Sequence, residues 1–381
     1  MEDLVGDLVE GRLLSHIQSH YFGLLQRMID ASIVRPRKLG AVLTAGYWLA
    51  SRLTLVEPSY FGAGNLVREM NLLMLLDIVY RGTAYKDLVD SLDKIGRKVL
   101  SNYICVIACL VGVEELCCPD KLERRRDWFA SVSRRIYVVR RIKTRHTSGR
   151  RLMLVKVTDE IGPPMLVTDS IDILVESLTS LSPRFLHHVT GGARTLSIID
   201  VGAYNGETSL RYAALAKKMG SRSVVYAVEP DPISYRVLVF NSKLVGHAVK
   251  PVNVFLSDRE GVEELISRGP SSSSRSLIGR GNGVRVRVVP AWRVASWALS
   301  DLENAHLHVR VDTEGAEEQV IRGLMPVLER LKSFSIEVAV YHRLGDLLRF
   351  YNIFRDLAHG FTLTWSSMDF RDLMLVAYRH S

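Results

Sequence analysis

The sequence has 381 residues, of which 47% are hydrophobic and 24% charged. This composition excludes a disordered chain, and the length favours two domains or one domain with a large extension. The net charge of +9 permits an anionic partner. The most apolar windows, 41–56 and 103–113, fall short of the roughly 18 residues that suggest a membrane-spanning helix, so we predict no membrane span.

The N-terminus and the cysteines bear on localisation. Residues 1–11 include acidic residues and lack the basic segment and apolar core of a signal peptide, which predicts a cytoplasmic protein. The four cysteines lie in one short stretch without the paired CxxC spacing of a zinc site. We interpret them as buried thiols in a reducing compartment; they are Cys105, Cys109, Cys117 and Cys118.

The first third of the chain has a helical pattern. Apolar residues recur at helical spacing up to about residue 118, which predicts a helical N-terminal domain over residues 1–120. No motif indicates its role, which could be acceptor recognition or formation of a homo-oligomer. Residues 121–195 are predicted to be a basic linker followed by a hairpin, with strands at 136–139 and 152–157.

Strands and helices alternate from residue 196 onward. The predicted strands are 196–201, 224–228, 252–256, 306–311, 334–340, 361–365 and 373–378. Only a short loop separates the last two, so they should pair antiparallel. The pattern predicts an α/β domain over residues 196–381, with a doubly wound, seven-stranded and mostly parallel sheet that ends in an antiparallel hairpin. The serine-rich stretch 269–283 is predicted to be a flexible loop.

A glycine-containing turn joins the first predicted strand to a helix at 207–219. The turn reads Asp200-Val201-Gly202-Ala203-Tyr204-Asn205-Gly206. A dinucleotide-binding loop needs a second glycine where this chain has Tyr204. Asp200 would repel a pyrophosphate but could attract, often through water, the ammonium group of S-adenosylmethionine.

Acids also follow the second and third predicted strands. Glu229, which precedes Pro230, could accept hydrogen bonds from ribose hydroxyls. Asp258, which follows Ser257, is placed to accept from an adenine amine, although a solvated turn residue is the alternative. The two acids therefore extend the candidate nucleoside site along one edge of the sheet.

These segments resemble the FkbM-type methyltransferase family, with its Asp-x-Gly-Ala-x-x-Gly, Glu-Pro-x-Pro and Ser-Asp-x-x-Gly motifs. Residues 309–317 are similar to the family's Lys-x-Asp-x-Glu-Gly-Ala-Glu signature, with Arg310 where lysine is usual. The resemblance implies a class I methyltransferase fold, S-adenosyl-L-methionine as donor, and O-methylation of an acceptor that is often a sugar or a secondary metabolite. The candidate cofactor-binding residues are Asp200, Gly202, Ala203, Tyr204, Asn205, Gly206, Glu229, Pro230, Ser257 and Asp258.

The candidate catalytic residues are Asp312, Glu314 and His342. They follow the fourth and fifth predicted strands, at the edge of the sheet where ligands bind, and a carboxylate or an imidazole can take the proton of an acceptor hydroxyl. Asp312 could instead be only a cap, and His342 could be structural. Glu317 and Glu318 could serve the helix dipole. A divalent metal held by Asp312 and Glu314 is conceivable, but the sequence does not decide this and we assign no metal.

Two other functions remain open. The basic segment 121–151 could bind RNA, which would make the protein an RNA methyltransferase. Against this, the fourth strand ends in Asp312-Thr313-Glu314 and not in the Asn/Asp-Pro-Pro-aromatic motif of base-amine methyltransferases, so a nucleic-acid partner is not favoured. A non-catalytic binding module is the second alternative, and the intact Asp200, Gly202 and Glu229 argue against it. We therefore expect an O-methyltransferase with a small-molecule or glycan acceptor.

Overall fold

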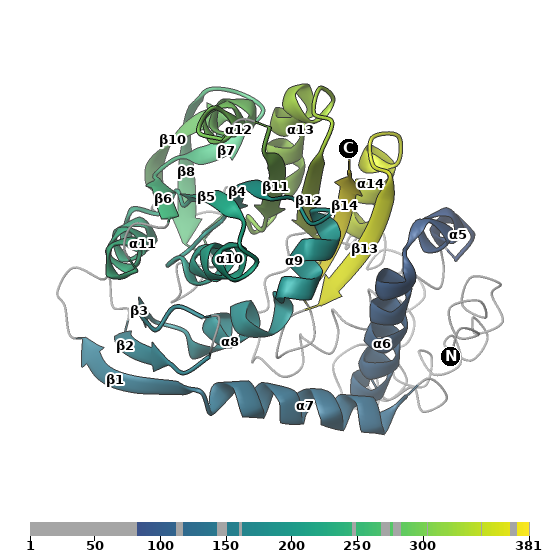
Figure 1. The fold of residues 1–381 in the computed structure, drawn as a ribbon, viewed down its shortest axis with the longest axis horizontal. Helices are drawn as coiled ribbons and strands as arrows, with labels where there is room; N and C mark the ends of the chain where they lie inside the picture. The colour runs from purple at the N-terminus through teal and green to yellow at the C-terminus, as the bar shows by residue number, and fades with distance from the viewer. Residues whose placement is uncertain are drawn as a thin grey trace, which may run out of the picture.

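A mixed sheet of seven strands lies at the centre of the computed structural model (Figure 1). The structure describes residues 82–111, 117–142, 151–159, 162–245, 249–267, 275–276, 283–302, 304–343, 345–365 and 372–380. The strands of the sheet, in the order in which they pair, are β13 (Gly360–Trp365), β14 (Leu373–Arg379), β12 (Phe334–Ala339), β11 (His306–Val311), β4 (Thr195–Val201), β5 (Arg222–Val228) and β6 (Val249–Val252). β14 pairs antiparallel with β12 and β13, and the other pairs are parallel. The chain thus closes the sheet with a hairpin, as the short loop predicts.

Helices pack on both faces of this sheet (Figure 1). One face carries α8 (Ile171–Ser180), α9 (Pro183–Val189), α10 (Glu207–Lys218) and α11 (Pro232–Leu244). The other carries α5 (Gly82–Ser91), α6 (Lys94–Val111), α12 (Ala291–Ser300), α13 (Glu317–Leu328) and α14 (Asp346–Phe354). Successive side chains of a strand point to opposite faces, so Ile198 joins the core on the α10 side and Ile199 the core on the α12 side.

Helix α6 belongs to the core of the sheet. Gly96 allows it to approach β13 closely, because a Cβ at this position would lie 2.9 Å from the Cα of Thr362. Tyr103 meets Trp365 edge to face, with ring centroids 5.3 Å apart. The boundary predicted at residue 120 therefore does not separate two hydrophobic cores. The predicted helices before residue 82 lie outside the described residues, and no described helix is long and apolar enough to cross a membrane.

The third predicted strand is two separate elements, so the prediction of one strand at 252–256 was wrong. β6 ends at Val252, and β7 (Phe255–Ser257) belongs to a second sheet with β8 (Gly261–Ser267), β9 (Arg275–Ser276) and β10 (Val284–Pro290), in the order β7-β10-β8-β9. Asn253 lies between β6 and β7, and its side-chain amide donates to the backbone oxygens of Glu229 and Pro230. These bonds hold the chain where it leaves the main sheet. Most of the serine-rich stretch lies outside the described residues.

A third sheet precedes the main sheet in the chain. It contains β1 (Ile136–Ile142), β2 (Leu152–Val157) and β3 (Met165–Thr168), which pair antiparallel in chain order. The predicted hairpin at 136–139 and 152–157 is therefore present. Helix α7 (Pro119–Ser133) leads into it along one side of the molecule (Figure 1). The hydroxyl of Thr168, at the end of β3, donates to Glu207 Oε1 at 2.7 Å and thereby joins this sheet to the start of α10.

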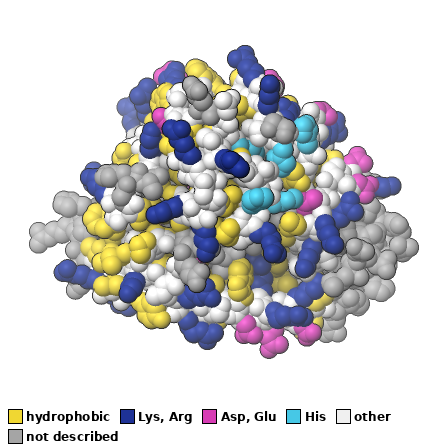
Figure 2. Space-filling model, viewed as in Figure 1, with side chains coloured by type: hydrophobic (Ala, Val, Ile, Leu, Met, Phe, Trp, Pro, Cys, Tyr) yellow, Lys and Arg dark blue, Asp and Glu magenta, His cyan; other side chains and the backbone are white. Residues whose placement is uncertain are grey.

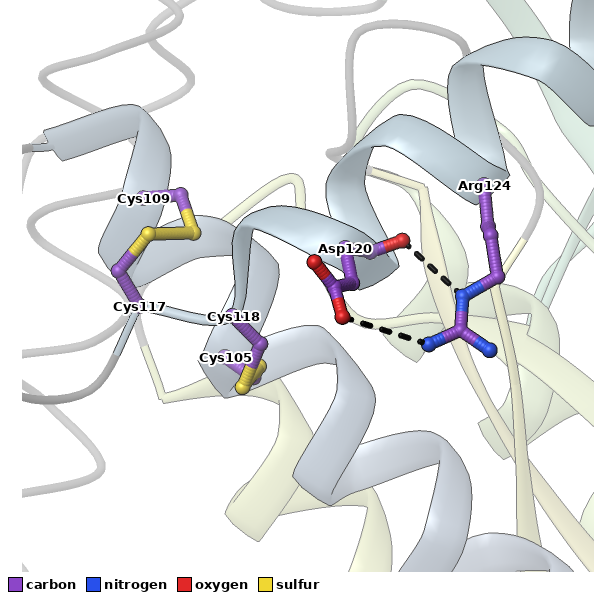
Figure 3. The surroundings of a disulfide bond; sticks show 6 residues. All are labelled: Cys105, Cys109, Cys117, Cys118, Asp120 and Arg124. Atoms are coloured by element: carbon purple, nitrogen blue, oxygen red, sulfur yellow. Dashed lines mark hydrogen bonds and ion pairs between the residues drawn. A yellow bond between two sulfur atoms is a disulfide. The ribbon is translucent and has the colours of Figure 1, made fainter.

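The four cysteines form two disulfides, Cys105–Cys118 and Cys109–Cys117 (Figure 3). Both connect α6 to the residues just before α7, over sequence separations of 13 and 8 residues. None of these cysteines is free, so the interpretation as buried thiols was wrong. Disulfides persist mainly in oxidising compartments, and the cysteines therefore no longer support the cytoplasmic prediction.

Candidate active site

The glycine turn begins where the central strand β4 ends. Gly202 and Gly206 have φ values of 85° and 93°, and Tyr204 between them has 52°. A Cβ on Gly202 would overlap the backbone oxygen of Asp312, so only glycine lets the turn lie against the segment after β11. The close approach that Gly202 allows in the structure is thus between two segments of the chain.

Glu229 ties the ends of β4 and β5 together. Its Oε2 accepts from the Tyr204 N–H at 2.8 Å, and its Oε1 accepts from the Asp231 N–H at 2.7 Å. The Asp231 side chain caps α11 by accepting from the Ser234 N–H. Glu229 therefore lies beside the glycine turn. This is expected, because Glu229 follows β5 and the turn follows β4, and these two strands are parallel neighbours.

The sequence interpretation missed a residue at this turn, Asp169. The Tyr204 hydroxyl donates to both of its oxygens, at 2.6 and 2.8 Å, and the Asn205 amide donates to Oδ1 at 2.9 Å. Asp169 follows β3 and precedes the Ser170 cap of α8. Its only sequence signal was that of a helix start, and the contact spans 35 residues, so no local pattern could place it.

Arg310 connects the turn to the candidate catalytic segment. Its Nη2 donates to Asp312 Oδ2 at 2.6 Å, and its Nη1 lies 3.4 Å from Asp200 Oδ1. Asp200 is completely buried, and its Oδ2 accepts from the Ser209 hydroxyl at 2.6 Å. Burial raises the pKa of Asp200, and the Arg310 charge opposes that rise. Burial would lower the pKa of Arg310, but Asp312 and Asp200 keep it well above its ordinary value.

The three candidate catalytic residues are brought together. His342 Nε2 lies 3.8 Å from Asp312 Oδ1 and 3.6 Å from Glu314 Oε2. The Tyr341 hydroxyl, which sequence reasoning did not assign, donates to Asp312 Oδ1 at 3.0 Å. Glu314 has a φ of 56°, an uncommon conformation for a residue with a side chain, and such residues cluster at functional sites.

Glu317 holds the other side of the His342 ring. Its Oε1 accepts from His342 Nδ1 at 3.0 Å and from the Thr313 and Gly315 N–H groups. Burial would raise the pKa of Glu317, but His342 and the N–H groups of Glu317 and Thr313 lower it to about 2. Burial would likewise lower the pKa of His342, but Glu317, Glu314 and Asp312 raise it to about 10. This glutamate thus has a role at the site beyond the helix dipole.

Ser257 ends β7 and Asp258 follows it, so neither follows a strand of the main sheet. Asp258 is exposed, and its Oδ1 accepts from the Ser257 hydroxyl at 3.1 Å. Gly323 lets α13 pack against the backbone of Ser257. Among the described residues, Asp258 is hydrogen-bonded to Ser257 and not to the glycine turn. Glu229, in contrast, bonds directly to the turn at the Tyr204 N–H.

The basic segment is partly used inside the fold. The Arg125 guanidinium lies 3.6 Å from the ring centroid of Trp365 and donates to the backbone oxygen of that residue. Arg135 pairs with Asp159 at 3.3 Å. Figure 2 shows that Lys and Arg side chains are spread over the visible face of the molecule and do not gather on one element.

The strand order and the turn after β4 define a class I methyltransferase-like fold. In agreement with the motifs, residues 200–361 match the family model described as the methyltransferase FkbM domain. This part of the chain is therefore similar to FkbM-type methyltransferase domains. No curated protein matches the chain in sequence.

Several solved structures are similar to the chain at low identity. The methyltransferase FkbM from Methylobacillus flagellatus KT is 16% identical with a TM-score of 0.46, over 81% of this chain and 62% of that one. This chain thus spans about three fifths of that protein's length. An O-methyltransferase from Bacillus cereus in complex with SAH is 11% identical (TM-score 0.32, 55% and 83% covered). The N-terminal domain of human METTL16, also with SAH, is 13% identical (TM-score 0.30, 51% and 67% covered).

Proposed function

We propose that this protein transfers a methyl group from S-adenosylmethionine to a hydroxyl oxygen of a sugar, glycan or small metabolite. The observation that carries the proposal is the contact between two sets of residues at adjoining strand ends. One set is the glycine turn with Glu229, and the other is Asp312, Glu314 and His342. Arg310 bonds to an aspartate of each set, so the two sets form one site.

The donor half consists of the turn from Asp200 to Gly206 and Glu229. Glycines with positive φ at both ends of the turn let its backbone lie across the strand ends, where ligands of open α/β sheets bind. We assign Glu229, which bonds to the turn at the Tyr204 N–H, to accept from the ribose hydroxyls. Asp200 contributes by fixing Arg310 and Ser209, and Asp258 is assigned to the adenine on sequence grounds. S-adenosylmethionine supplies an electrophilic methyl group on a sulfonium.

The acceptor half must hold a hydroxyl and receive its proton. In the reaction the hydroxyl oxygen bonds to the methyl carbon, the carbon–sulfur bond breaks with its electron pair left on sulfur, and the hydroxyl proton passes to a base. Asp312 accepts hydrogen bonds from Arg310 and Tyr341 on its two oxygens, whereas the Glu314 side chain is 33% exposed. We assign Glu314 to meet the incoming hydroxyl and Asp312 to hold the cluster in place.

The proposal also assigns roles to the parts of the chain around the site. We assign residues 196–381 to catalysis, with α5 and α6 as part of the same core. The N-terminal segment 1–120 keeps the roles predicted for it, which are acceptor recognition or homo-oligomer formation. The RNA alternative would use the other basic residues of the segment 121–151, because Arg125 packs on Trp365 and Arg135 pairs with Asp159.

Methyl-labelled S-adenosylmethionine tests the chemistry. The protein is incubated with the labelled donor and panels of sugars, hydroxylated metabolites and RNA. We expect label in a hydroxyl acceptor, and Asp312→Asn and Glu314→Gln should each lower the rate by ~10² or more. Glu318→Gln is the matched control, because this acid of α13 bonds to Arg322 and Arg349 and its loss should leave the rate unchanged. Label found only in RNA would contradict the proposal.

A further inference from the structure

The nitrogen of His342 that faces the two carboxylates is in an unusual position. The His342 side chain is 8% exposed, and its Nε2 has no hydrogen-bond partner although it is buried. The other ring nitrogen, Nδ1, lies against the carboxylate of Glu317, which can only accept a hydrogen bond when it is ionised. The proton of a neutral His342 is therefore on Nδ1, and the lone pair of Nε2 points toward Asp312 and Glu314.

Two carboxylates that face this nitrogen need a positive species beside them, which is either a proton on Nε2 or a cation bound between the three groups. The gaps of 3.8 Å to Asp312 Oδ1 and 3.6 Å to Glu314 Oε2 are wide for a charge-assisted hydrogen bond, which spans about 2.7–2.9 Å. A metal ion fits these gaps, because two metal–ligand bonds of about 2.1 Å can span up to about 4.2 Å. We propose that His342 Nε2, Asp312 Oδ1 and Glu314 Oε2 bind a divalent metal ion.

The residues around this site are arranged as at metal centres in proteins. A histidine ligand commonly donates its second ring N–H to a carboxylate, which fixes the ring, and Glu317 occupies that place. The ligating carboxylate of Asp312 is itself held by the Tyr341 hydroxyl and by Arg310. The three groups whose ligand atoms lie within 4.8 Å of one another are Asp312, Glu317 and His342. Glu317 Oε1 already accepts from His342 and from backbone N–H groups, so we assign the third ligand to Glu314, whose Oε2 lies 3.6 Å from His342 Nε2.

The ligand set indicates the class of metal. One imidazole and two carboxylates suit a divalent first-row ion such as Mn²⁺ or Zn²⁺. Three protein ligands leave coordination positions open, which is typical of catalytic and not of structural sites. The role of the ion depends on the proposed methyl transfer: it would hold the acceptor hydroxyl oxygen and make its proton easier to remove. The site itself depends only on the geometry.

Manganese binding tests the site without any turnover. The full-length protein is freed of metal with a chelator and titrated with Mn²⁺ alone, and the loss of the electron paramagnetic resonance signal of the free ion is recorded. We expect one Mn²⁺ per chain, with affinity lowered about 100-fold or more in His342→Gln and about 10-fold to 100-fold in Glu317→Gln. Zn²⁺ should displace the bound Mn²⁺. Glu318→Gln is the control and should bind as the wild type does.

A further variant guards against effects on folding. Glu314→Gly removes a ligand while glycine suits the φ of 56° at that position, so we expect a folded protein with weak Mn²⁺ binding. Failure of the wild type to bind Mn²⁺, or unchanged binding in both His342→Gln and Glu314→Gly, would overturn the metal site. Calorimetry with S-adenosylmethionine on the metal-free protein separates the two proposals: donor binding without Mn²⁺ binding rejects only the metal, and Mn²⁺ binding without donor binding rejects only the methyl transfer.

Discussion

Arg310 carries the contact between the two halves of the site. It lies between the carboxylates of Asp200 and Asp312, and Asp200 is completely buried. Removal of one member of a buried ion pair leaves a charge uncompensated and typically costs about 3–5 kcal/mol. The arginine therefore matters for stability as well as for the alignment of the two segments.

Replacement of Arg310 tests this role. Arg310→Met should lower the free energy of unfolding by about 3–5 kcal/mol and weaken donor binding, because Asp200 would lose its cationic partner. Arg310→Lys keeps the charge and introduces the residue usual in the family signature. It should therefore retain most of the stability and most of the donor affinity. Urea unfolding and calorimetry provide the measurements. Equal stability of the Met and Lys variants would show that the charge is not needed.

Glu207 predicts a pH dependence of stability. Its carboxyl is buried at the start of α10. Burial raises its pKa from 4.5 to about 7, although the hydrogen bond from Thr168 acts to lower it. The folded protein therefore holds this proton more tightly than the unfolded chain does. The stability that follows from this difference is present below pH 4.5 and is lost as the pH rises from there to about 7.

The variant Glu207→Gln cannot titrate and should flatten that decline. We expect the loss of unfolding free energy between about pH 5 and about pH 8 to shrink by on the order of 1 kcal/mol. Urea unfolding at several pH values measures it. Glu318→Gln, at a half-buried acid on α13, should leave the slope as in the wild type. A slope that Glu207→Gln does not change would mean that this carboxyl titrates normally in the fold.

At the level of elements, α6 is the helix whose position the sequence did not predict. Gly96 lies in its first turn, where a Cβ would come within 3.1 Å of the backbone of both Thr362 and Leu363. The contact that fixes α6 on β13 is therefore one of backbone against backbone. Helix propensity alone would favour alanine over glycine by about 1 kcal/mol. Whether Gly96→Ala raises or lowers the stability of the protein therefore tells whether helix propensity or the close contact with β13 dominates.

Gly96→Ala should destabilise the protein by about 1–3 kcal/mol, because the added methyl group must push α6 away from β13. Gly261→Ala is the matched control, since nothing lies within 4 Å of a Cβ there, and it should change stability by less than about 0.5 kcal/mol. Thermal unfolding compares the two variants. A stabilised Gly96→Ala variant would show that α6 does not pack on β13 as described.

The elements also show how far sequence reasoning reaches. The turn after β4 was predictable because its glycines, its acid and the flanking hydrophobic runs are all local. The split between β6 and β7 was not predictable, since it involves the bonds of Asn253 to a loop more than 20 residues away. Asp169 was missed for the same reason. The metal geometry depends on His342 and Glu317 meeting across 25 residues, which sequence spacing alone does not reveal.

At the scale of the whole molecule, one sheet holds together segments from residue 82 to residue 380. The described helices on both faces share cores with it, and two disulfides fix the end of α6 to the start of α7. In the chain-entropy account, closing a loop of this size contributes up to about 3 kcal/mol. The strand ends that carry the candidate site are therefore held by packing on both faces of the sheet.

The central claim, that this scaffold binds S-adenosylmethionine, is tested most directly by calorimetry. The protein is titrated in turn with S-adenosylmethionine, with its demethylated product and with NAD. We predict saturable binding of the first two with one site per chain, and no binding of NAD, because Tyr204 replaces the second glycine of a dinucleotide loop. Glu229→Gln should weaken both interactions. Binding of NAD with no binding of S-adenosylmethionine would contradict the account.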